Sequence, residues 1–98
     1  MSEYAPVFIV DAIEPDNESV IIHVGSTPEK ALAFAIANYK DYCERPGSQL
    51  NITKEEVDNP AVIIHHAFIA KVFYDGRVMV SDDYPELKEH ERNAVLHS

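Results

Sequence analysis

The stretch from Glu29 to Gly47, "EKALAFAIANYKDYCERPG", decides the fold, because it places seven consecutive apolar residues, 31–37, inside a helical pattern. At about 100° per residue, one stripe of such a helix gathers the apolar side chains that face a sheet. The members of that stripe are Leu32, Ala35, Ile36, Tyr39 and Cys43. Phe34 projects roughly 160° away from the stripe. We therefore predict a helix that covers a sheet with one side and presents an aromatic ring on the other.

Both ends of this helix are marked in the sequence. Thr27 followed by Pro28 is typical of an N-cap and a first helical position. The alternative start has Ser26 as the cap and Glu29 at the third position, which is a capping box. We expect the helix to run to about Glu44, because "RPG" follows it.

Two β-rich segments precede the helix and indicate a hairpin. "PVFIVDAIE" begins at Pro6 and reads as a strand, and "VIIHVG", 20–25, reads as a second. Pro, Asp and Asn in "PDNES", 15–19, are turn residues. The short connection favours an antiparallel pair.

A second hairpin is predicted after the helix. Asp75–Gly76 separates two β-rich runs and favours a two-residue type I′ turn. Such a turn would set Phe73 opposite Val78 and Lys71 opposite Val80. The first arm, residues 61–74, is long for one strand, and we expect a bulge or a split near residues 65–67.

The two faces of this long arm both carry large apolar side chains. On an unbroken strand, Ile64, Phe68, Ala70, Val72 and Tyr74 would share one face with His66, and Ile69 and Phe73 would lie on the other with His65, Ala67 and Lys71. A sheet covered by one helix should be polar on its second face. The uncovered apolar surface therefore favours association, most simply a homodimer.

The remaining segments complete a two-layer α+β domain. We predict an irregular loop over residues 46–60 and a last helix that begins at Asp82 or Asp83. The expected order is ββαββ plus a C-terminal helix, with an antiparallel sheet of about four strands packed on the central helix. The 98 residues suit a single domain, 1–98. Phe34 is covered either within the chain, by Leu50, Ile52 or Leu87, or by a partner.

The charge balance narrows the partners. Seventeen acidic residues face eight basic ones, for a formal net charge of −9. Such a chain repels nucleic acid and anionic membranes, and it is attracted to a basic protein. The alternative is that the acidity only maintains solubility. The single cysteine and the absence of a signal-peptide pattern are typical of a cytoplasmic protein.

No recognisable catalytic motif is present. The chain has three glycines and no glycine-rich phosphate loop, and its histidines lack the spacing of a zinc site. We therefore predict no enzymatic activity, no cofactor and no metal. Cys43 near a helix C-terminus should be an unreactive core thiol.

The carboxylates form three groups, around the first turn, in the segment 55–58, and in the tail. They are either a solvated surface or a negatively charged binding surface. With the exposed ring of the helix, the predicted partner-binding residues are Asp11, Glu14, Asp16, Glu18, Phe34, Asp82, Asp83, Glu86 and Glu89.

A hairpin "VFIVDAIEPDNESVIIHV", an alanine-rich helix and then "VFYDGRVMV" resemble the small acidic proteins of phages and plasmids, among them anti-CRISPR proteins and DNA mimics. The resemblance implies an inhibitor that occupies the basic, nucleic-acid-binding groove of a host defence protein, with carboxylates in place of phosphates. The alternative is a small homodimeric enzyme or ligand-binding domain, with an intersubunit pocket near His65, His66 and Tyr74.

Overall fold

The computed structural model describes residues 6–59 and 62–93, and within 56–66 it describes no side chains. The chain forms five strands and one α-helix, followed by a short 3-10 helix. Their bounds are β1 Val7–Ile13, β2 Ser19–Gly25, α1 Pro28–Tyr42, β3 Gln49–Asn59, β4 Val62–Phe73, β5 Val78–Val80 and η1 Pro85–His90. The α+β class, the single antiparallel sheet and the one main helix match the prediction, and the order is ββαβββ rather than ββαββ.

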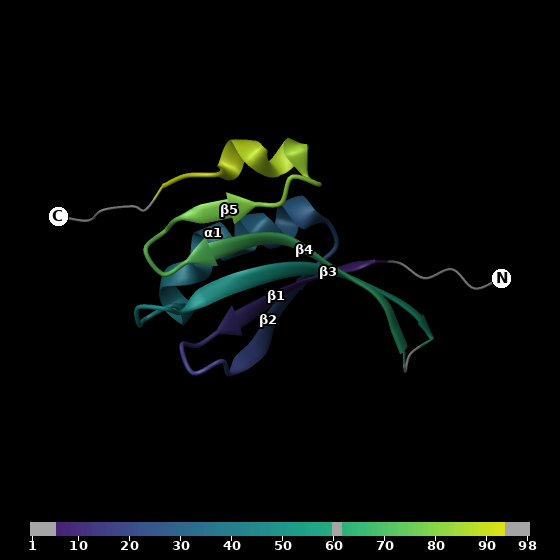
Figure 1. Ribbon diagram of the computed structural model, residues 1–98, viewed down its shortest axis with the longest axis horizontal. Coiled ribbons are helices and arrows are strands. Elements are labelled where there is room, and N and C mark those ends of the chain that lie inside the picture. Colours follow the sequence, from purple (N-terminus) through teal and green to yellow (C-terminus); the bar gives the residue numbers. More distant parts are fainter. Residues whose placement is uncertain (1–5, 60–61, 94–98) are drawn as a thin grey trace.

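The strands form one antiparallel sheet in the order β2-β1-β3-β4-β5. Helix α1 connects the outer strand β2 to the central strand β3 and crosses one face of the sheet on the way (Figure 1). It contacts β1, β2, β3 and β4. Among the described residues, no helix or strand covers the other face, which we call the open face.

The predicted loop at 46–60 was wrong, because most of it is strand β3. Leu50 and Ile52 are fully buried and alternate with polar residues, which is the pattern of a half-buried strand. The charged residues that follow suggested a loop. They are held in the sheet because β3 pairs with β1 on one side and with β4 on the other.

The helix start is as predicted. The Thr27 hydroxyl accepts a hydrogen bond from the Lys30 backbone N–H at 3.1 Å, and Pro28 occupies the first turn. The helix ends slightly before Glu44, at Tyr42, where the Cys43 N–H donates to the Tyr39 carbonyl at 2.7 Å. Four of the five stripe residues are buried, and Ile36 is half-buried.

Replacing Thr27 with alanine should lower the free energy of unfolding by about 1 kcal/mol, because it leaves the Lys30 N–H without its capping oxygen. Urea denaturation measures this loss. Thr27→Ser is the matched control, because it retains the hydroxyl and should stay within about 0.5 kcal/mol of the parent. Equal losses in both variants would contradict the cap.

Both hairpin turns are three-residue loops closed by a residue with positive φ. Asn17 has φ 70° and Gly76 has φ 87°, the left-handed conformation that follows a type I turn in such loops. The predicted type I′ turn at Asp75–Gly76 was wrong, because that turn needs positive φ at both residues and Asp75 does not have it. The Phe73 N–H donates instead to the Arg77 carbonyl at 2.8 Å.

The extra loop residue shifts the register of the second hairpin. Val72 pairs with Val78, and Ala70 pairs with Val80, whereas a two-residue turn would have placed Phe73 opposite Val78. A one-residue slip moves every side chain of a strand to the other face. Val78 and Val80 consequently face α1 with Val72, whereas the predicted register would have put them on the open face with Phe73 and Lys71.

A bulge in β4 alters the faces again. Ile52 pairs with Ala70 and Thr53 pairs with Phe68, so Ile69 is the extra residue. The predicted residues 65–67 lie between this bulge and a second register shift, where Glu56 pairs with His65 and Val57 with Ile63. It turns Phe68 onto the open face, opposite to the expectation that Phe68 and Ala70 share a face. Ile69 is fully buried on the helix side.

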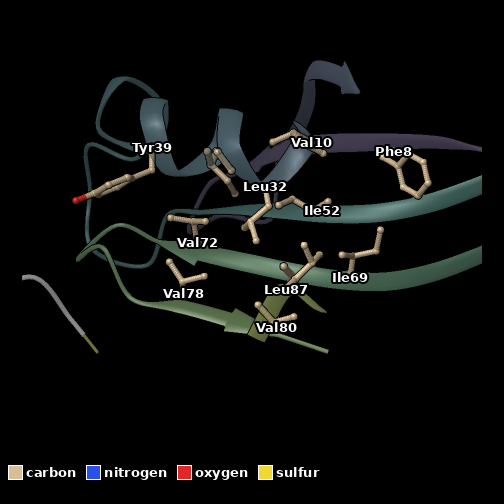
Figure 2. Close-up of a cluster of buried hydrophobic side chains, with 14 of the residues drawn as sticks. Phe8, Val10, Leu32, Tyr39, Ile52, Ile69, Val72, Val78, Val80 and Leu87 are labelled. Atoms are coloured by element: carbon tan, nitrogen blue, oxygen red, sulfur yellow. The ribbon is translucent and has the colours of Figure 1, made fainter. Parts of the chain in front are cut away.

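The core fills the space between α1 and the sheet (Figure 2). Its largest fully buried apolar side chains come from the helix, from four of the strands and from η1. They are Leu32 of α1, Val10 of β1, Leu50 and Ile52 of β3, Ile69 and Val72 of β4, Val78 of β5 and Leu87 of η1. Two of the residues proposed to cover Phe34, Leu50 and Ile52, lie in the sheet, and Leu87 packs near Ile69 and Val80.

The C-terminal helix prediction was partly wrong. The segment after β5 is a short 3-10 helix that lies along the outer edge of the sheet (Figure 1). The Val80 N–H donates to the Glu91 carboxylate at 2.8 Å, and the Lys88 ammonium donates to the Val80 carbonyl at 2.9 Å. Arg92 then pairs with Val78 through two backbone hydrogen bonds. These bonds occupy edge groups of β5, which protects that edge from pairing with another chain.

Candidate functional site

The open face of the sheet is a candidate interaction surface, and the strand register arranges its side chains in rows. The middle row crosses all five strands and consists of Ile21, Asp11, Asn51, Lys71 and Met79. The row on one side of it consists of Val24, Ile9, Thr53 and Phe68. The row on the other side consists of Ser19, Ile13, Gln49 and Phe73. Apolar residues therefore flank a polar centre on β3.

Four large apolar side chains of this face are exposed. Ile21 is 57% exposed, Val24 54%, Met79 48% and Phe68 39%. They lie on β2, β4 and β5, on both sides of the central strand, so the exposure extends across the sheet. The exposed apolar side chains thus form two areas, one on each side of the polar centre, and such areas are candidate interaction surfaces.

The polar centre of the open face contains buried atoms that lack a partner within the described part of the chain. They are the side-chain oxygens of Asn51 and Thr53. A buried polar atom without a hydrogen bond costs free energy. Lys71 lies beside them, and its ammonium is 5.7 Å from the centre of the Phe68 ring.

The predicted acidic turn is exposed and has a fixed shape. The Glu14 N–H donates to the Glu18 carbonyl at 2.8 Å, and the Asp16 carboxylate accepts from the Glu18 N–H at 3.2 Å. Arg45 binds the Glu14 carboxylate at 2.7 Å. The hydrogen bond and charge of Glu14, with the charges of Asp16 and Glu18, raise the pKa of Arg45. Glu14 thus contacts the guanidinium, and the charges of Asp16 and Glu18 also act on it.

The second acidic segment, at Asp82–Glu89, is also exposed. Lys88 binds the Asp82 carboxylate at 2.7 Å, and this contact lowers the pKa of Asp82. Asp83, Glu86 and Glu89 are exposed. This segment follows β5 at one edge of the sheet, whereas the acidic turn joins β1 to β2 near the opposite edge (Figure 1). The fold therefore does not bring the two acidic groups together, and Asp11 lies apart from both surfaces in the middle row of the open face.

Phe34 is half-buried, and its cover comes from an unexpected residue. The His23 ring stacks on it with 4.0 Å between ring centres and 4° between planes. Tyr42 lies 6.4 Å away in a tilted arrangement. His23 faces α1 because it pairs with Val10, next to the bulge in β2. No sequence signal pointed to this contact, because it depends on that bulge.

The residues of the alternative pocket do not gather within one chain. The side chains of His65 and His66 lie outside the described residues, and their backbone pairs with Glu56 and Glu55. Tyr74 is beyond the opposite end of β4, where it lines an open depression of about 340 Å³. Among the described residues, no three His, Cys, Asp or Glu side chains gather as metal ligands.

The geometry defines a small α+β protein with one covered and one open sheet face. Comparison with protein-family models, curated proteins and solved structures finds no match for this chain. Within the described ranges, no helix has both the length and the apolar character needed to cross a membrane.

Proposed function

We propose that this chain is a small, acidic, non-enzymatic binding protein that acts by contact with a basic protein. The observation that carries the proposal is the exposed turn between β1 and β2, where three carboxylates outnumber the single guanidinium of Arg45. The hydrogen bonds of the turn hold its backbone in one conformation. A preformed charged surface binds with less loss of conformational entropy than a flexible one.

The specific form of this function is inhibition in the cytoplasm of a host cell. A basic partner that binds nucleic acid already presents lysines and arginines to phosphates, and the exposed carboxylates would occupy the same groove. The formal net charge of −9 favours such an encounter. An inhibitor carried by a phage or plasmid, of the anti-CRISPR or DNA-mimic type, is the class that fits.

The test is competition with DNA on purified basic nucleic-acid-binding proteins of host defence systems. We expect the chain to bind one of them, to displace a labelled duplex, and to lose about tenfold in affinity as the ionic strength rises from about 0.05 M to about 0.5 M. Binding that ignores salt, or that leaves the duplex in place, would contradict the proposal.

A charge reversal locates the contact. Asp16→Lys should weaken this binding about tenfold or more, because it places a cation in the centre of the acidic turn. Glu29→Lys is the matched control, since it makes the same charge change at an exposed position of α1. Equal losses in the two variants would mean that only the net charge matters and that the turn is not the contact.

A further inference from the structure

We propose that the open face of the sheet is the interface of a homodimer, in which two copies stack face to face about a twofold axis that runs along β3. The occupant of the face is thus a second copy of this chain. The inference rests on the register of the sheet and does not depend on the proposed function.

The axis fixes which residues meet. Rotation about this axis leaves positions along the strands unchanged and moves the strands on one side of β3 to the other side. β1 of one copy therefore faces β4 of the other. In the middle row, Asp11 then faces Lys71 and Ile21 faces Met79. Each flanking row adds one apolar facing pair, namely Ile9 with Phe68 and Ile13 with Phe73, while Thr53 and Gln49 face their own copies on the axis.

The charges select this axis over the other simple one. A twofold axis across the strands would set β1 on β1 and β4 on β4, and it would oppose Asp11 to Asp11 and Lys71 to Lys71. Like charges in contact at an interface are unfavourable by several kcal/mol. With the axis along β3, each copy contributes one acid and one base to two equivalent pairs.

The usual crossing angle between packed sheets leaves these residue pairs within contact distance. Two aligned sheets cross at about 30°. Asp11 and Lys71 each lie one strand, or about 4.8 Å, from β3, so this rotation moves them past each other by only about 2–3 Å. Long side chains absorb such a shift.

The polar residues of β3 lie on the axis, where each meets its own copy. Asn51 has a side-chain oxygen without a partner in the described single chain. A carboxamide offers both an acceptor and two donors, so two facing copies of Asn51 can bind each other reciprocally. A polar centre surrounded by apolar residues also fixes the register of a symmetric interface.

The face is large enough. Four strands over seven residues each and β5 over its three residues, at about 4.8 Å between strands and about 3.4 Å per residue, cover roughly 500 Å² per copy. Two copies together bury about 1,000 Å², which is the lower limit of a specific interface. Helix α1 stays on the outside of the resulting sandwich.

The experiment is charge exchange at the facing pair, read by light scattering and by native mass spectrometry over a range of concentrations. We expect the parent chain to dimerise, and Asp11→Lys and Lys71→Asp each to weaken the dimer at least tenfold. The double variant should recover dimerisation, because its two pairs are complementary again. An equimolar mixture of the two single variants should form the heterodimer, which no contact within one chain can explain.

Asp16→Lys is the matched control, because it makes the same charge change on the acidic turn, outside the open face. It should leave the dimer intact, while it weakens binding to a basic partner, so failure of the interface and failure of the proposed function are told apart. Circular dichroism melts establish that each variant folds. If a single variant is destabilised, the equimolar mixture still tests the facing pair, because the heterodimer restores the complementary charges.

Three results would overturn the inference. The first is a parent chain that remains a monomer at every concentration up to about 0.1 mM, where even weak specific interfaces begin to form. The second is a dimer that Asp11→Lys does not weaken, which would place the interface elsewhere, for example at the outer edge of β2. The third is a double variant that stays as weak as the single ones, which would exclude the axis along β3.

Discussion

Replacing Leu32 with alanine is expected to lower the free energy of unfolding by about 3 kcal/mol, which is a large part of the stability of a domain this size. Leu32 is 1% exposed. Its side chain leaves α1 toward the sheet and lies beside Ile52 of β3 (Figure 2). Truncation removes the contacts that join the two layers and leaves a cavity between rigid walls, which collapses only in part.

Urea denaturation at one low protein concentration measures this effect, and the melting temperature should fall by about 15 °C. Val20→Ala is the matched control, because Val20 is 61% exposed at the outer strand β2 and away from the open face. It should change the free energy of unfolding by less than about 0.5 kcal/mol. A loss below about 1 kcal/mol for Leu32→Ala would mean that α1 is not packed on the sheet in solution.

The helix was predictable because its signals are local. The cap at Thr27 and the stripe that includes Leu32 and Ala35 depend on residues within a few turns of one another, and the structure has both. The same argument identified Phe34 as the residue outside the stripe. Its neighbour His23 was not predictable, because that contact joins two elements whose relative position depends on a bulge.

Strand β3 was missed for a different reason. The segment from Gln49 to Asn59 contains lysine, glutamates and asparagines that are uncommon in strands, and its own propensity favours a loop. Pairing with β1 and β4 outweighs that propensity. The segment itself marks the strand only by the alternation of Leu50 and Ile52 with polar residues, and the prediction of a loop did not use it.

The open face could be expected in outline and not in detail. The large apolar residues on both faces of the arm 61–74 led to the prediction that the chain associates. The proposed facing of Asp11 and Lys71 depends on the central position of β3 and on the bulge at Ile69, and that of Ile21 and Met79 depends also on the three-residue turn at 74–76. A shift of one residue at any of these places moves the side chains to the wrong face. The acidic residues required no such precision, because exposed turns are polar in any register.

The thiol of Cys43 is expected to react with iodoacetamide at least about 100-fold more slowly in the folded chain than in the unfolded chain. Cys43 is 5% exposed, at the end of α1. Burial, together with the negative charge of Glu14, raises the pKa of this thiol from 9.0 to about 11. Two pH units correspond to a hundredfold smaller fraction of the reactive thiolate at pH 8.

The raised pKa of Cys43 also makes the stability of the fold depend on pH. Because this pKa is higher in the folded chain than in the unfolded chain, the protonated thiol favours the folded state. This contribution to the free energy of unfolding is complete below about pH 9 and is lost as the pH rises through about 11. Glu14→Gln separates the two causes, since it removes the carboxylate and leaves the burial. We expect the variant to react several-fold faster than the parent and still far more slowly than the unfolded chain. Alkylation of the folded parent at the unfolded rate would show that the end of α1 is open to solvent and would contradict the prediction.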